Sequence, residues 1–133
     1  MKTVHIAEVI AEGGRDGIVE SPDGGFRAEL SSDPQPGNVT PEHLFGAAYA
    51  AFFLGSLKNH AKEAHVSVDG FTVVAKTYLE EDGKGEYSLH IDLRAAMPGL
   101  NRNDAQHLLN LAHQTCPYSK ATRGNIIVNL SFD

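Results

Sequence analysis

The sequence contains very little cysteine, because its 133 residues include a single one, Cys116. One thiol excludes an intrachain disulfide, and it also excludes any metal site that needs several cysteines of the same chain. Clusters of lysine and arginine are absent as well, and 11 basic side chains face 17 acidic ones, for a net charge of −6. Because binding to phosphates requires a basic surface, we expect neither a nucleic-acid partner nor attachment to an anionic membrane.

Long hydrophobic runs are also missing. Residues 44–57 carry no charge, but this segment is shorter than the roughly 20 residues that a membrane-spanning helix needs. The first ten residues hold neither a basic start nor an apolar signal segment, so we expect a cytoplasmic protein. With 41% hydrophobic and 21% charged residues, the composition is typical of a globular protein, and the length predicts one domain over residues 1–133.

The first third of the chain predicts short β-strands. Apolar residues alternate over residues 3–10, which predicts a first strand, and residues 12–17 contain three glycines that suit a turn with positive φ. Two further strands are predicted at residues 18–21 and 26–30, joined by a hairpin turn at residues 22–25.

A long helix is predicted to follow. Thr40 suits the N-cap, Pro41 the first helical position, and Glu42 the positive end of the helix dipole. The helix is expected to reach about His65, and it is apolar around most of its circumference. Such a helix must be covered on most sides. Since a chain of this size supplies too little cover, the segment predicts a homodimer built around it.

The second half of the chain predicts longer elements. Strands are expected at residues 66–79 and 87–97, and the last strand at residues 125–132. Between them lies a second helix that ends at Pro117. Its expected packed face consists of Ala105, Leu108, Leu109, Ala112 and Cys116. This order of elements predicts an α+β fold, with an antiparallel sheet packed around a long central apolar helix.

Three polar residues are candidates for a functional site. Arg15 lies in the glycine-rich turn, Glu42 opens the long helix, and Cys116 lies on an apolar helix face. Taken singly, each has an ordinary interpretation as a solvated charge, a partner of the helix dipole or a small core residue. Together they are chemically compatible, because a guanidinium stabilises a thiolate and a carboxylate orients the guanidinium.

The chain resembles the organic hydroperoxide resistance (Ohr) branch of the OsmC/Ohr superfamily over nearly its whole length. Five segments carry the resemblance in the same order, namely residues 12–17 (EGGRDG), 40–45 (TPEHLF), 48–51 (AYAA), 53–57 (FLGSL) and 113–125 (HQTCPYSKATRGN). The resemblance implies an OsmC-like α+β fold in an intertwined homodimer. It also implies reduction of organic hydroperoxides, including fatty-acid hydroperoxides, with a thiol or a lipoylated protein as the reductant.

The resemblance assigns roles to individual residues. Arg15 matches the activating arginine of the family, Glu42 its partner, and Cys116 the resolving cysteine, which condenses with the sulfenic acid of a peroxidatic cysteine. Family members read Tyr-Ala-Ala-Cys-Phe where residues 49–53 read Tyr-Ala-Ala-Phe-Phe. Phe52 thus stands at the peroxidatic position, and a phenyl ring cannot attack an O–O bond.

Several hypotheses follow for the function. The first is an Ohr-like protein without the two-cysteine peroxidase activity, which binds hydrophobic or fatty-acyl ligands whose carboxylate Arg15 steers. The alternative is a one-cysteine, thiol-dependent organic hydroperoxide reductase with Cys116 as nucleophile. A third is a protein that has kept the fold and lost the chemistry, or a chain in which residue 52 has been altered. No cofactor is expected, and because no two histidines have the i, i+4 spacing of a zinc motif, no metal site is expected.

Overall fold

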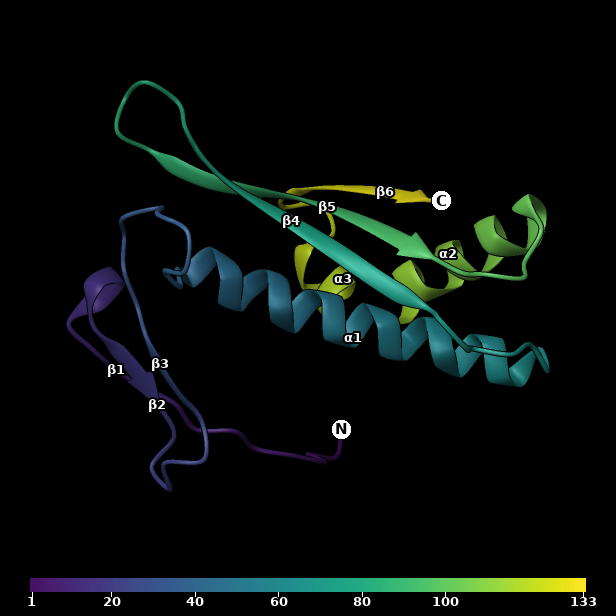
Figure 1. The fold of residues 1–133 in the computed structure, drawn as a ribbon, viewed down its shortest axis with the longest axis horizontal. Helices are drawn as coiled ribbons and strands as arrows, with labels where there is room; N and C mark the ends of the chain where they lie inside the picture. The colour runs from purple at the N-terminus through teal and green to yellow at the C-terminus, as the bar shows by residue number, and fades with distance from the viewer. The chain divides into compact units, whose positions relative to one another are not determined.

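The computed structural model describes all 133 residues and divides them into two compact units, Met1–Leu44 and Phe45–Asp133. Figure 1 gives the order of the elements, which combines two three-stranded sheets with helices and confirms the α+β class. The single domain expected from chain length stays a prediction.

The first unit contains a small antiparallel sheet. Strand β1 (Ile10–Glu12) pairs with β2 (Ile18–Glu20), which pairs with β3 (Arg27–Glu29). A short 3₁₀ helix, η1 (Gly14–Asp16), connects β1 to β2. The glycine-rich turn has the expected backbone, with φ of 85° at Gly13 and 65° at Gly14.

The strand predicted over residues 3–10 is wrong in extent, because only Ile10 of that segment belongs to a strand. Residues 1–9 lie in no helix or strand, and the apolar side chains of Val4 and Ile6 are exposed. An alternating pattern becomes a strand only where a neighbouring strand satisfies its backbone N–H and C=O groups. No segment of this chain pairs with residues 1–9.

Helix α1 (Pro41–Glu63) begins where the sequence predicted. The Thr40 hydroxyl accepts a hydrogen bond from the His43 backbone N–H at 3.3 Å, and the Thr40 N–H donates to His43 Nδ1 at 2.9 Å, which together cap the helix. The helix ends two residues earlier than predicted. His65 has φ of 58°, and the N–H of Val66 bonds the carbonyl of Ala61, a geometry that closes a helix C-terminus.

The second sheet belongs to the second unit. Strands β4 (Thr72–Glu81) and β5 (Tyr87–Ala96) pair antiparallel, as expected, although the strand predicted from residue 66 begins only at Thr72. A turn occupies the missing part, since Phe71 N–H bonds the carbonyl of Val68 and Gly70 has positive φ. Strand β6 (Ile127–Phe132) pairs parallel to β5 and departs from the purely antiparallel sheet of the prediction.

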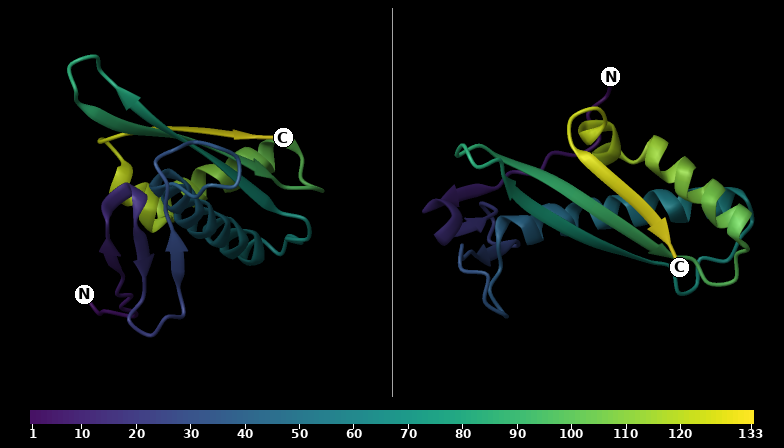
Figure 2. Two further views of the ribbon diagram at one scale, coloured as in Figure 1. Left: turned by 60° about the vertical axis from the view of Figure 1, so that its left-hand side comes forward. Right: turned by 90° about the horizontal axis from the view of Figure 1, so that it is seen from above.

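The parallel pairing follows from the connection between β5 and β6. That connection contains α2 (Arg102–Thr115) and α3 (Pro117–Thr122). The two helices return the chain to the end of the sheet at which β5 begins, so β6 runs in the same direction as β5. Figures 1 and 2 show β6 beside β5 after this crossover. The sequence pattern predicts the end of a helix at Pro117 but not α3, although proline also suits a first helical position.

The core of the second unit lies between the sheet and its helices. Side chains of α1, β5 and α2 form one buried cluster, so these helices pack against the same face of the sheet. The predicted face of α2 is confirmed, since Ala105, Leu108, Leu109 and Ala112 are all buried. The buried stripe of α1 covers only part of its circumference and consists of Gly46, Tyr49, Phe53, Leu57 and Ala61.

Candidate functional site

Arg15 and Glu42 meet within the first unit. The Nη2 atom of Arg15 donates to both carboxylate oxygens of Glu42, at 3.3 Å each. Gly13 and Gly14 shape the turn that carries Arg15, and the capped start of α1 places Glu42 in the first helical turn. The pair holds the guanidinium through one nitrogen. Because half of the Arg15 side chain is exposed, its other donors keep access to solvent or to an anion.

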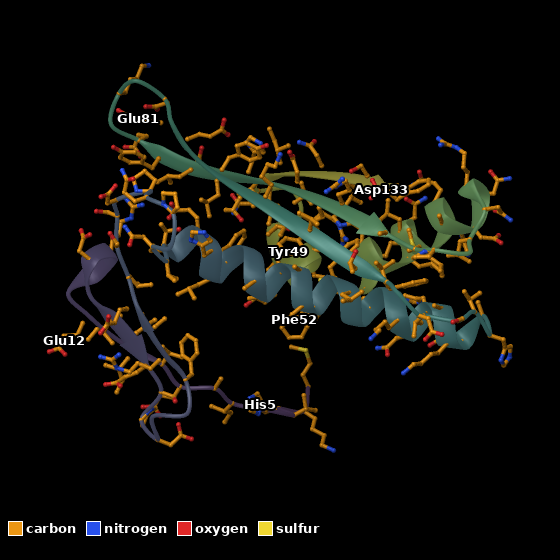
Figure 3. All side chains as sticks on the ribbon, viewed as in Figure 1. His5, Glu12, Tyr49, Phe52, Glu81 and Asp133 are labelled. Carbon is orange, nitrogen blue, oxygen red and sulfur yellow. The ribbon has the colours of Figure 1, made fainter.

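Phe52 lies on α1 in the second unit. Its side chain is 49% exposed, whereas Tyr49, one turn earlier, is fully buried (Figure 3). The Phe52 ring lies 5.2 Å from the ring of Tyr118 on α3, with an angle of 34° between the planes. Tyr118 also contacts the rings of Tyr49 and Phe45, at 5.7 and 6.4 Å. Phe52 is therefore the half-exposed member of a four-ring cluster.

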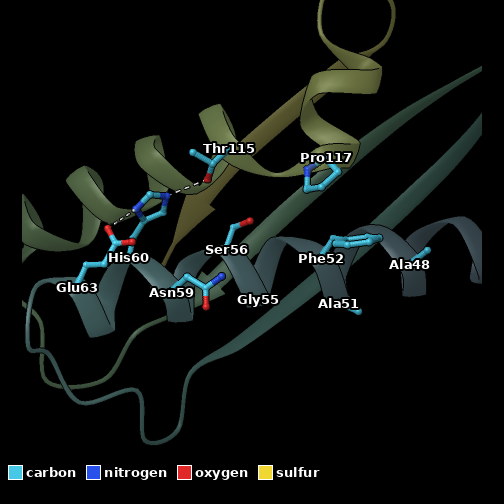
Figure 4. A pocket seen from close by; sticks show the side chains of 10 residues that line it. All are labelled: Ala48, Ala51, Phe52, Gly55, Ser56, Asn59, His60, Glu63, Thr115 and Pro117. Atoms are coloured by element: carbon cyan, nitrogen blue, oxygen red, sulfur yellow. Dashed lines mark hydrogen bonds and ion pairs between the residues drawn. The ribbon is translucent and has the colours of Figure 1, made fainter. Parts of the chain in front are cut away.

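A cavity of about 760 Å³ opens beside Phe52 (Figure 4). Its apolar part contains Phe52 itself, small residues of α1 and Pro117 at the start of α3. Its polar part lies further along α1 and at the end of α2. The lining residues are Ala48, Ala51, Phe52, Gly55, Ser56, Asn59, His60, Glu63, Thr115 and Pro117.

The polar part of the cavity is organised around His60. Its Nε2 atom lies 2.9 Å from the hydroxyl of Thr115, which in turn donates to the carbonyl of Leu111 at 3.0 Å. On the other side of the ring, Nδ1 lies 3.8 Å from a carboxylate oxygen of Glu63 (Figure 4). These contacts fix the imidazole at the wall of the cavity. The sequence pattern around His60 carries no sign of this arrangement, because Thr115 lies 55 residues away.

Cys116 lies at the junction between α2 and α3. Its backbone N–H bonds the carbonyl of Ala112 at 2.8 Å, and its carbonyl accepts from the N–H of Lys120 at 3.0 Å. The side chain is fully buried within the core cluster. As predicted, Cys116 continues the packed face of α2, and burial in this position suits a small core residue.

A buried polar network joins α1 to α3 and to the end of α2. The Tyr49 hydroxyl lies 2.9 Å from the hydroxyl of Ser119 and 3.2 Å from that of Thr122. Ser119 also lies 2.8 Å from Nδ1 of His113. Burial, with a smaller contribution from the charge of Arg123, lowers the pKa of His113 below its usual value. With Tyr49 about 70 residues from its partners, local sequence patterns carry no sign of this network.

The structure therefore brings Arg15 and Glu42 together in one unit, and it places Phe52 and Cys116 in the other. No group of three or more histidine, cysteine, aspartate or glutamate side chains has the arrangement of a metal site. None of the helices combines the length and the apolar character that a membrane crossing requires.

Comparison with known proteins gives a consistent result. The family of OsmC-like proteins matches residues 33–131. An organic hydroperoxide resistance protein of Xanthomonas axonopodis pv. citri is 36% identical over 135 residues, which cover 98% of this chain and 95% of the relative.

Solved structures agree with the sequence relatives. An organic hydroperoxide resistance protein from Legionella pneumophila matches with a TM-score of 0.92 and 34% identity, covering 99% of both chains. A second, from Vibrio cholerae, matches with a TM-score of 0.91 and 34% identity, covering 99% of this chain and 94% of the other. That structure contains captopril in one of its active sites.

Proposed function

The chain belongs to the OsmC-like family, and on that premise we propose that it is an Ohr-type protein without the two-cysteine peroxidase activity. Its proposed role is the binding of hydrophobic or fatty-acyl ligands in the cavity beside Phe52. The observation that carries this proposal is Phe52 itself, a half-exposed phenyl ring at the cavity wall. The family resemblance implies that this residue stands where the peroxidatic cysteine is expected.

The chemistry of a two-cysteine peroxidase explains why Phe52 matters. In that cycle a thiolate attacks the peroxide, the O–O bond breaks, the alcohol leaves, and the sulfur becomes a sulfenic acid. A second thiol then displaces water from the sulfenic acid and forms a disulfide, which an external dithiol reduces. With Phe52 in the first position, Cys116 has no partner thiol in its own chain.

The dimensions of the cavity support ligand binding. Its volume of about 760 Å³ lies within the range of roughly 300–1,000 Å³ that small-molecule sites occupy. A cavity with an apolar wall and a polar end suits an amphipathic molecule. The presence of captopril in an active site of the Vibrio cholerae relative shows that this relative's site admits a small organic molecule. The part that Arg15 takes in steering a ligand carboxylate stays a prediction.

The proposal includes assembly into a homodimer. The buried stripe of α1 leaves neighbouring apolar residues such as Ala47 and Ala51 exposed. A second copy of the chain would cover part of this surface. Light scattering coupled to size exclusion is expected to give twice the mass of one chain, and a monomeric mass would remove this part of the proposal.

A peroxidase assay tests the proposal. We expect the native chain to reduce an organic hydroperoxide no faster than the buffer, with a dithiol as reductant. Phe52→Cys restores the missing thiol and is expected to gain turnover, whereas Phe52→Ser, the matched control, is not. Turnover by the native chain would contradict the proposal. If Cys116→Ser then abolished that turnover, the one-cysteine reductase would be the function, although the burial of Cys116 counts against it.

Ligand binding needs a separate measurement. Fatty acids of increasing chain length are expected to raise the melting temperature of the native chain, because a ligand that binds only the folded state stabilises it. If no amphipathic acid raises the melting temperature at concentrations below its micelle threshold, the binding role fails.

A further inference from the structure

The start of helix α1 is held by a capping box that contains a histidine. Thr40 is the N-cap and His43 the third helical position, and each side chain accepts a hydrogen bond from the backbone N–H of the other, at 3.3 and 2.9 Å. Glutamate or glutamine fills the third position in the usual form of this motif. We propose that His43 makes the capping box sensitive to pH, so that protonation of its ring opens the box and releases Arg15 from Glu42. This device is independent of the proposed function, because every group that it uses lies in the first unit.

The hydrogen bond from the Thr40 backbone determines which ring nitrogen of His43 carries the proton. A backbone N–H can only donate, so Nδ1 presents its lone pair and the ring proton lies on Nε2. An imidazolium ring has a proton on both nitrogens and no acceptor. Protonated His43 can still donate to the Thr40 hydroxyl, 2.9 Å away, but the Thr40 N–H loses its partner. Because Thr40 is buried, water replaces that partner poorly, and the loss is costly.

The charges around the start of α1 also oppose a proton on His43. The first turn of a helix has a partial positive charge, which disfavours a cation there. Arg15 of η1 adds a full positive charge and already occupies the neighbouring carboxylate of Glu42. Of the other charged groups on the segments that meet here, Asp16 accepts hydrogen bonds from the loop before α1, and Asp33 lies exposed in that loop. The box is therefore closed at neutral pH and opens below about pH 6.5, where a free histidine gains its proton.

Opening of the box reaches Arg15 through Glu42. Glu42 lies between Thr40 and His43 in the first turn of α1, so its position depends on that turn. Its two carboxylate oxygens accept from Nη2 of Arg15 at 3.3 Å each. These hydrogen bonds are long for a charged pair, and about half of the Arg15 side chain is exposed. A frayed first turn therefore frees the guanidinium for another anion.

Nuclear magnetic resonance of the isotope-labelled chain tests both states of the box. At about pH 8, long-range correlations of the His43 ring are expected to place the proton on Nε2, and a proton on Nδ1 would overturn the proposal. Between about pH 7.5 and 5.5, the protection of the Thr40 amide against hydrogen exchange should fall about five- to tenfold after correction for the intrinsic rate. Unchanged protection would overturn the proposal as well.

Two substitutions of His43 separate the capping box from general effects of acid. His43→Gln keeps an acceptor that cannot gain a proton, so the Thr40 amide should be protected equally at both pH values. His43→Ala removes the acceptor and should leave the amide unprotected at both. The matched control is His5→Gln, which changes an exposed histidine outside the helices and strands and should keep the native response. A pH response that survives in His43→Gln, or that disappears in His5→Gln, would contradict the role of His43.

The release of Arg15 can be measured without a change of pH. Phenylglyoxal modifies guanidinium groups, and mass spectrometry gives the rate of modification at each arginine. At about pH 8, Arg15 should react about two- to fivefold faster in His43→Ala than in the native chain or in His43→Gln. Arg27, which pairs with Glu20 and Glu29 away from the box, is the internal reference. Equal rates at Arg15 in all three chains would overturn the link between the box and Arg15.

Discussion

The hydroxyl of Tyr49 on α1 lies 2.9 Å from the hydroxyl of Ser119 on α3, and both side chains are fully buried. This hydrogen bond joins two elements that are about 70 residues apart in the chain. It also lies beside the aromatic ring of Tyr118, which supports Phe52 at the cavity wall. The hydrogen bond that joins α1 to α3 therefore lies in the same part of the core as the aromatic rings behind the proposed ligand site.

Tyr49→Phe is expected to lower the free energy of unfolding by about 1–2 kcal/mol, because the buried hydroxyls of Ser119 and Thr122 each lose a partner. Urea denaturation followed by circular dichroism measures the change. Tyr87→Phe is the matched control, since Tyr87 is exposed, and its effect should stay within about 0.5 kcal/mol. Equal effects of the two substitutions would show that the buried hydrogen bonds contribute nothing to stability.

Two glycines of α1 are expected to respond differently to alanine. A Cβ on Gly46 would lie 2.9 Å from the hydroxyl oxygen of Thr77 on β4, whereas a Cβ on Gly55 meets nothing within 4 Å. Both substitutions gain the same helix propensity, so that contribution cancels in the comparison. Gly46→Ala should be less stable than Gly55→Ala by about 1–3 kcal/mol, the usual cost of overpacking.

A double variant checks the cause of this difference. The Thr77 hydroxyl is buried and has no hydrogen-bond partner, so Thr77→Ala removes the obstacle to a methyl group without breaking a bond. Gly46→Ala combined with Thr77→Ala is expected to cost less than the sum of the single effects. Strict additivity would contradict a direct contact between the two positions.

The pH dependence of stability should show the effect of His113. Burial, with help from the charge of Arg123, lowers the pKa of His113 in the folded state. The unfolded chain then binds a proton more readily, so stability is complete above the unfolded pKa of about 6.5 and declines as the pH falls below it. In the His113→Gln variant, the melting temperature should change less with pH between about pH 5 and 7 than it does in the native chain. His107→Gln, an exposed position on the same helix, should leave the slope unchanged.

A second decline in the stability of the fold is expected at lower pH, because Asp92 becomes protonated. Hydrogen bonds from the Asn129 amide and, less strongly, the Tyr78 hydroxyl lower the pKa of this carboxyl group. The ionised carboxylate therefore stabilises the fold above its unfolded pKa of about 3.9, and this contribution is lost as the pH falls through the folded value. Asp92→Asn should reduce the acid slope, whereas Asp69→Asn, on an exposed turn, should not. Identical acid titrations of both variants would contradict the assignment.

The sequence predicts the fold well where capping residues and hydrophobic spacing favour the same element that packing in the core stabilises. Thr40 and Pro41 predicted the start of α1, and the spacing of Leu108, Leu109 and Ala112 predicted the buried face of α2. Prediction failed where the outcome depends on distant segments. Residues 1–9 have an alternating pattern but no strand to pair with, and the direction of β6 is set by the crossover through α2 and α3.

The candidate site was predictable in its residues and less so in its geometry. The chemical compatibility of Arg15 and Glu42 predicts a pair, and the two side chains form an ion pair. Their roles and that of Cys116 stay predictions. The hydrogen bond between His60 and Thr115, like the Tyr49 network, joins positions that no periodicity relates. Such contacts exist only once the helices have packed, so a sequence pattern carries no sign of them.

The parallel pairing of β6 with β5 has a consequence for folding and for handling of the protein. Strand β6 can add to the sheet only after the chain has crossed over through two helices, so its pairing spans a long loop and is expected to form late. Until then, β5 presents an open edge with apolar side chains, a surface that pairs readily with other chains. Removal of Ile127–Phe132 is therefore expected to make the chain aggregate during refolding, which light scattering during dilution from urea would detect.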